Sequence, residues 1–99
     1  MTASLVENLA SKFSLSKEEL VQKSIKAFLL NQLHLFEVER RKILTHHDVQ
    51  TLGEFDQLLI DNPNEESDLL ENFQRADYLT HRIEEISLWI KELNGNGRS

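Results

Sequence analysis

Histidines and carboxylates on two candidate long helices are the side chains that could bind a metal ion. His81 follows Asp77 by four residues, so the two share one helical face, and His34 lies on the other candidate helix. Carboxylate–histidine metal sites in helical bundles place a Glu three residues before each ligating His. Those positions hold Asn31 and Tyr78 in this sequence. The spacing therefore predicts surface ion pairs, with no metal site and no cofactor.

Arg75 and His81, separated by five residues, are a second candidate for chemistry. In this spacing the sequence resembles HEPN-type ribonucleases, which are helical and dimeric and hold an Arg and a His near the cleaved phosphate. The resemblance implies proton transfer by His81 and charge stabilisation by Arg75. The same spacing recurs at Arg40 and His46, so the pattern arises easily. Ribonuclease activity is therefore kept as an alternative function.

Other patterns typical of nucleotide or nucleic-acid binding are weak in this sequence. The one basic cluster, residues 40–42, points three ways around a helix and forms no stripe for a phosphate backbone. The three glycines are isolated, so no phosphate-binding loop is present. Without cysteine, the chain has no disulfide, thiolate metal site or thiol nucleophile. We expect no direct nucleic-acid binding and no enzyme activity.

The charge of the chain is concentrated in its second half. Residues 1–49 carry seven Lys or Arg and six Asp or Glu, whereas residues 50–99 carry four and eleven. An acidic half favours a basic protein partner, or serves solubility alone. The longest apolar runs fall far short of the roughly 20 residues that cross a membrane, and the start lacks a signal-peptide pattern. We expect a cytoplasmic protein without a membrane span.

Helix-start signals and apolar periodicity predict an all-α chain. Capping boxes, in which a Ser or Thr is followed by Glu three residues later, begin at Ser16 and Thr51. The apolar stripe from Leu69 to Leu93 has a step close to the 3.5-residue repeat of a coiled-coil seam. Together these patterns predict a single domain over residues 1–94, a flexible tail over 95–99, and helices over about 3–13, 17–45, 52–61 and 65–93.

The two long helices determine the expected architecture. Each spans about 45 Å, whereas a compact globule of this length has a diameter near 34 Å. We therefore expect an elongated antiparallel helical hairpin with the short third helix at the bend. Leu30, Leu35, Leu88 and Trp89 lie off the main seam, which favours a homodimer forming a four-helix bundle. Alternatively, residues 1–13 fold back to cover them. The residues predicted to pack the dimer are Phe28, Leu29, Leu33, Phe36, Leu69, Phe73, Leu79 and Ile83.

Residues 9–29, including the run LSKEELVQKSIKAFL at 15–29, resemble the two-helix part of ribbon-helix-helix proteins. These are small dimeric repressors, many of them antitoxins of toxin–antitoxin pairs. The β-strand that reads DNA in that family has no counterpart, because only residues 1–4 precede the helix, and Ser14 replaces the usual Gly between helices. The resemblance implies a dimerising antitoxin-type module without its DNA-reading part. The rest of the chain resembles small acidic prokaryotic proteins of uncharacterised role.

The sequence thus favours a non-enzymatic protein-binding module. Its most concrete form is an antitoxin-type or regulatory protein that dimerises and covers a basic partner, such as a toxin. The alternatives are the HEPN-like ribonuclease and a purely structural, self-assembling helical protein. The residues predicted to bind the partner are Glu65, Glu66, Asp68, Glu71, Glu84 and Glu85.

Overall fold

The computed structural model describes residues 2–63 and 67–96 as four α-helices with no strand among them. They are α1 (Thr2–Lys12), α2 (Lys17–His46), α3 (Leu52–Asp61) and α4 (Ser67–Asn96). The predicted all-α fold is confirmed. α4 continues to Asn96, beyond the predicted end at 93, so residues 95 and 96 belong to a helix and not to a tail. None of these helices has an apolar stretch long enough to cross a membrane.

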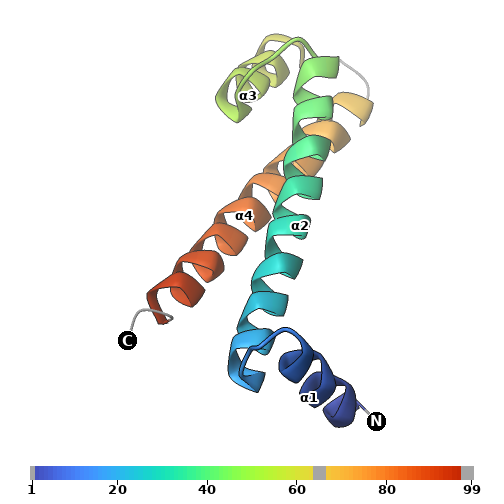
Figure 1. Cartoon of the computed structure of the whole chain (residues 1–99). Helices are drawn as coiled ribbons and strands as arrows, with labels where there is room; N and C mark the ends of the chain where they lie inside the picture. Colours follow the sequence, from blue (N-terminus) through green and yellow to red (C-terminus); the bar gives the residue numbers. More distant parts are fainter. Residues whose placement is uncertain (1, 64–66, 97–99) are drawn as a thin grey trace.

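α2 and α4 form an elongated antiparallel hairpin, as predicted, with α3 at the bend (Figure 1). The two long helices cross near α3 and diverge toward the other end of the hairpin, which we call the open end (Figure 1). α1 packs against α2 at the open end. The molecule measures 60 × 29 × 17 Å, with a radius of gyration of 19.5 Å. A compact domain of this length has a radius of gyration of about 13 Å, so the hairpin is unusually extended.

The starts of the two middle helices follow from their capping residues. At the start of α2, Ser16 Oγ accepts from the Glu19 N–H and the Glu19 carboxylate accepts from the Ser16 N–H, both at 3.0 Å. This is the predicted capping box. At α3, Thr51 Oγ1 accepts from the Glu54 N–H, but the Glu54 carboxylate accepts from the Gln50 N–H, one residue before the predicted position. Each helix therefore begins where its side chains satisfy free backbone donors.

The core is densest where α3 meets the two long helices. Phe55 of α3 is fully buried with Leu69 and Ala76 of α4, and its ring centre lies 5.4 Å from that of Phe73. Further along α4, the buried residues continue the seam of the hairpin: Leu79, Ile83 and Ile86. The α3 end is therefore a closed core, whereas the open end is held by one seam between two helices.

Candidate functional site

One broad face of the hairpin exposes large apolar side chains from both long helices. We call it the aromatic face. Each of its members is between 42% and 60% exposed. They are Val21, Ile25, Phe28 and Leu35 of α2 with Tyr78 and Trp89 of α4.

Contacts between the helices place these side chains on the same side of the molecule. On α2, Val21, Phe28 and Leu35 recur every seven residues and therefore lie in line with Glu39. The Glu39 side chain reaches α4, because its carboxylate accepts two hydrogen bonds from Arg75, at 2.6 and 3.0 Å.

On α4, Arg75 lies on the same side of the hairpin as Glu39, its partner on α2. Its guanidinium carbon lies 5.1 Å from the centre of the Tyr78 ring, so Tyr78 shares the side of the Glu39–Arg75 ion pair. Trp89 follows Tyr78 by 11 residues, about three helical turns, and therefore lies on the same side of α4. The aromatic face is thus continuous across the hairpin.

A hollow of about 310 Å³ opens between the diverging helices at the open end. Ile25 and Leu29 line it from α2, and Trp89, Glu92 and Leu93 line it from α4. Because Ile25 and Trp89 are also members of the aromatic face, the hollow extends that face toward the interior of the hairpin. Because four of its five lining residues are apolar, the hollow can accept an apolar side chain, with the Glu92 carboxylate at its wall.

The residues predicted to pack a dimer occupy two different environments. Phe28 is 60% exposed and belongs to the aromatic face. The other seven lie along the seam of a single hairpin. Leu29, Leu69, Leu79 and Ile83 are buried there, and Leu33, Phe36 and Phe73 are half-buried. The sequence analysis missed Val21, Ile25 and Tyr78 as exposed residues. The seven-residue repeat through Val21, Phe28 and Leu35 was a signal for Val21, whereas no such signal marked Ile25 or Tyr78.

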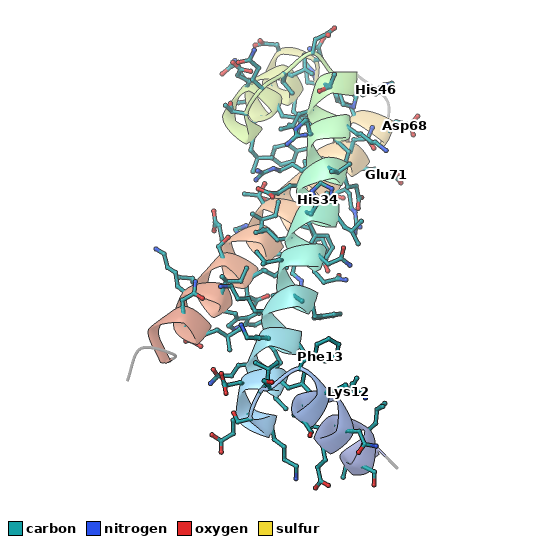
Figure 2. The ribbon with its side chains drawn as sticks, in the orientation of Figure 1. Lys12, Phe13, His34, His46, Asp68 and Glu71 are labelled. Atoms are coloured by element: carbon teal, nitrogen blue, oxygen red, sulfur yellow. The ribbon has the colours of Figure 1, made fainter. Side chains whose placement is uncertain are left out.

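The predicted partner-binding acids are spread along α4. Asp68 and Glu71 point outward from its first turns (Figure 2). Glu84 is exposed more than three turns further on, and Glu85 is half-buried and accepts from Arg82 Nη1 at 2.6 Å. Residues 65 and 66 lie outside the described part of the chain. The acids that are described therefore do not gather into one compact patch.

Arg75 and His81, the candidate ribonuclease pair, have separate partners. Arg75 is held by the Glu39 carboxylate, and this hydrogen-bonded ion pair lowers the pKa of Glu39 and raises that of Arg75. His81 lies 3.4 Å from Asp77, as its spacing predicted. Residues six apart on a helix point about 120° away from each other, so the two side chains do not converge. Among the described residues, no group of three His, Asp or Glu is placed to hold a metal ion.

His47 joins the end of α2 to α3 and α4. Its Nε2 lies 3.0 Å from Nδ2 of Asn72, and because an amide nitrogen donates, the ring nitrogen is the acceptor. The ring packs 4.8 Å from that of Phe55 and 4.9 Å from that of His46. Burial, and second the charge of His46, lower the pKa of His47. The geometry therefore favours the neutral ring.

We expect acid to destabilise the α3 end through His47. Since its pKa is lower when folded, the unfolded chain binds the proton more readily, and stability falls as the pH drops below about 6.5, the ordinary histidine value. The loss grows as the pH falls through the lowered pKa. Urea denaturation at several pH values measures it. His47→Gln should make the free energy of unfolding less dependent on pH, whereas His34→Gln, at an exposed position, should leave that pH dependence unchanged. The same pH dependence in the wild type and both variants would contradict the role of His47.

The fold and surface together define a small all-α protein, an elongated helical hairpin whose aromatic face is exposed. The family model described as "Uncharacterized protein MJ0235 family" matches residues 1–98, so the chain belongs to this family. No curated protein and no solved structure matches the chain. The resemblance of residues 9–29 to ribbon-helix-helix proteins does not emerge from these comparisons. Within residues 2–16, α1 begins at Thr2 and no strand precedes α2.

Proposed function

We propose that this protein is a non-catalytic interaction module that self-associates through the aromatic face. The observation that carries the proposal is the amount of surface the chain leaves uncovered. Its accessible surface is 7586 Å², whereas a compact monomer of 11.5 kDa exposes about 5,800 Å². The surplus of roughly 1,800 Å² lies in the range that one protomer of a stable homodimer buries.

The composition of the aromatic face supports a protein partner. Aromatic side chains and arginine dominate the binding energy of protein interfaces. Tyr78, Trp89 and Phe28 are the exposed aromatic members of this face, and Arg75 lies beside Tyr78. Leu30 points about 160° away from Phe28 around α2, and Leu88 points about 100° away from Trp89 around α4. Both are exposed outside the aromatic face, but neither is aromatic. Two hairpins packed through their aromatic faces form a four-helix bundle, which is a common solution for paired helices.

Sedimentation equilibrium at micromolar concentration tests this proposal. We expect a species of twice the 11.5 kDa chain mass. Because the interface is apolar, the dimer should persist at high salt, where screening weakens surface ion pairs. A species of single chain mass across the micromolar range would refute self-association.

We also propose that the acidic side chains of α4 bind a basic partner, as in an antitoxin-type protein. Asp68, Glu71 and Glu84 are exposed and form no ion pair with another described residue, which leaves them free for such a partner. Affinity capture from the host tests this role with a variant that carries Asp68→Asn, Glu71→Gln and Glu84→Gln. A basic protein bound stoichiometrically by the wild type and lost from the variant supports it. Equal recovery, or none, would favour the self-assembling alternative.

A further inference from the structure

In α1 the small apolar side chains face α2 and the large ones are exposed, which reverses the usual burial pattern. The residues that α1 turns toward α2 are small: Ala10 is buried, and Ala3 and Val6 line the hollow of about 580 Å³ between the two helices. The large residues Leu5 and Leu9, and Phe13 directly after the helix, are 57%, 39% and 67% exposed. An amphipathic helix normally buries its largest apolar residues. The outer side of α1 is therefore apolar and uncovered within the single chain.

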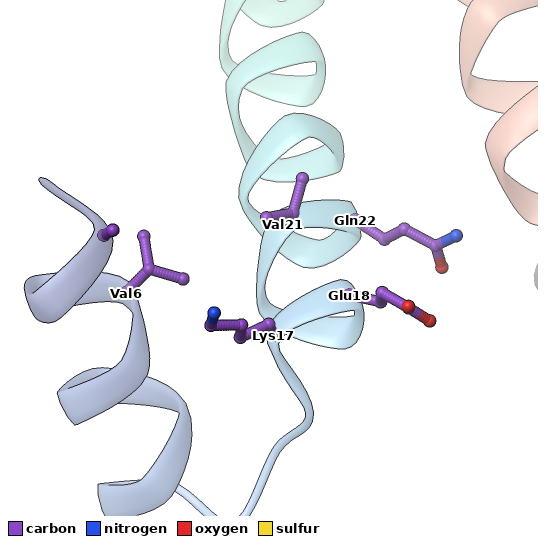
Figure 3. A pocket seen from close by; sticks show the side chains of 6 residues that line it. Val6, Lys17, Glu18, Val21 and Gln22 are labelled. Atoms are coloured by element: carbon purple, nitrogen blue, oxygen red, sulfur yellow. The ribbon is translucent and has the colours of Figure 1, made fainter.

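α1 lies beside the aromatic face. Val21, a member of that face, lines the hollow between α1 and α2 together with Lys17 (Figure 3). Val6 and Lys17 point into the gap between the two helices, and Glu18 and Gln22, which also line the hollow, extend from α2 away from α1 (Figure 3). The Lys17 ammonium and the Glu7 carboxylate, 2.8 Å apart, join α2 to α1. The position of α1 is thus at the open end, on the edge of the surface that we propose to be the dimer interface.

We propose that α1 is an arm that packs Leu5, Leu9 and Phe13 against the open end of a second copy of the chain. This inference rests on the proposed self-association. When two aromatic faces meet with their open ends together, the α1 of each protomer lies alongside the other hairpin. There the hollow lined by Ile25 and Trp89 provides an apolar surface at the level of the arm. The arm then supplies part of the surplus surface that the dimer buries.

The single tryptophan of the chain reports on the arm, because Trp89 lines the hollow that the arm would cover. We expect Leu9→Glu and Phe13→Glu each to raise the dimer Kd at least about tenfold and to shift Trp89 emission to longer wavelength. Phe13 follows the helix and is exposed, so its substitution leaves the fold of the monomer intact. Ser11→Glu, which places the same charge at an exposed position on the opposite side of α1, is the control and should change neither quantity.

The outcomes distinguish a failure of the proposed α1 arm from a failure of the proposed self-association. If the wild type dimerises but Leu9→Glu and Phe13→Glu change neither Kd nor emission, the arm is refuted and self-association stands. A wild type that sediments as a monomer removes both proposals. The two substitutions are also combined with Phe28→Glu, a change that disrupts the aromatic face. If they shift Trp89 emission equally in that monomeric background, α1 covers its own chain and the arm is refuted.

Discussion

Replacing Phe55 with alanine is expected to lower the free energy of unfolding by about 3–5 kcal/mol. The side chain is fully buried where α3 meets the long helices, and its ring contacts those of His47 and Phe73. A cavity at this point cannot be filled by collapse, because residues of three helices surround it. The loss is a large share of the roughly 5–15 kcal/mol that stabilises a small protein. Urea denaturation measures it, with both proteins at one concentration because dimerisation contributes to stability.

Ile60→Ala is the matched control for Phe55→Ala. Ile60 lies on the same short helix but is 62% exposed, so its truncation should change stability by no more than about 0.5 kcal/mol. If the two substitutions destabilised the protein equally, the core would not be organised around Phe55. A loss below about 1 kcal/mol for Phe55→Ala would lead to the same conclusion.

Replacing Phe28 with glutamate is expected to convert the dimer to a monomer at micromolar concentration. In the free chain this position is 60% exposed, so a charged residue there leaves the hairpin folded. In the proposed dimer it is buried beside the second copy, where an unpaired carboxylate costs several kcal/mol. A penalty of about 3 kcal/mol raises the Kd more than a hundredfold. Sedimentation measures the mass, and circular dichroism confirms that the helices remain.

Leu88→Glu provides the control for Phe28→Glu. Leu88 is 61% exposed and points about 100° away from Trp89 around α4, off the aromatic face, so the same charge there should leave the dimer intact. If both variants became monomeric, the interface would have to include the side of α4 on which Leu88 lies. If neither did, the aromatic face would not be the interface.

The architecture could be predicted from the sequence because its signals are local. The capping box at Ser16 marks the start of α2, and the absence of Gly and Pro from residue 17 to 45 carries the helix onward. The turn before Pro63 separates α3 from α4. Two helices too long for a globule then require an extended hairpin, which the structure has.

The division of apolar residues between core and surface could not be predicted in the same way. α2 carries two neighbouring apolar stripes, one through Leu29 and Phe36 and one through Val21 and Phe28. Periodicity identifies both, but only the crossing of α2 and α4 decides which stripe is buried. For the same reason, the burial of Phe55 under α4 depends on contacts between residues far apart in the chain.

The sequence can locate a helix without showing which of its residues contact the neighbouring helix. α1 is recognisable from its apolar spacing, but the sequence does not tell which residues face α2. The structure turns the small side chains Val6 and Ala10 inward and leaves Leu5 and Leu9 outside. The candidate site therefore emerged from the arrangement of the helices. Of its members, the sequence analysis had named Phe28 as a dimer-packing residue and Leu35 and Trp89 as residues off the main seam.

Small-angle X-ray scattering of the wild-type protein distinguishes a dimer packed through the aromatic faces from a monomer, because it measures mass and shape together. Packing of two hairpins through their aromatic faces thickens the molecule across its 17–29 Å dimensions while leaving the 60 Å dimension nearly unchanged. We therefore predict a particle of twice the 11.5 kDa chain mass with a maximum dimension close to that of one hairpin. A particle of single chain mass with a radius of gyration near 19.5 Å would contradict packing through the aromatic faces, as would a dimer of doubled length.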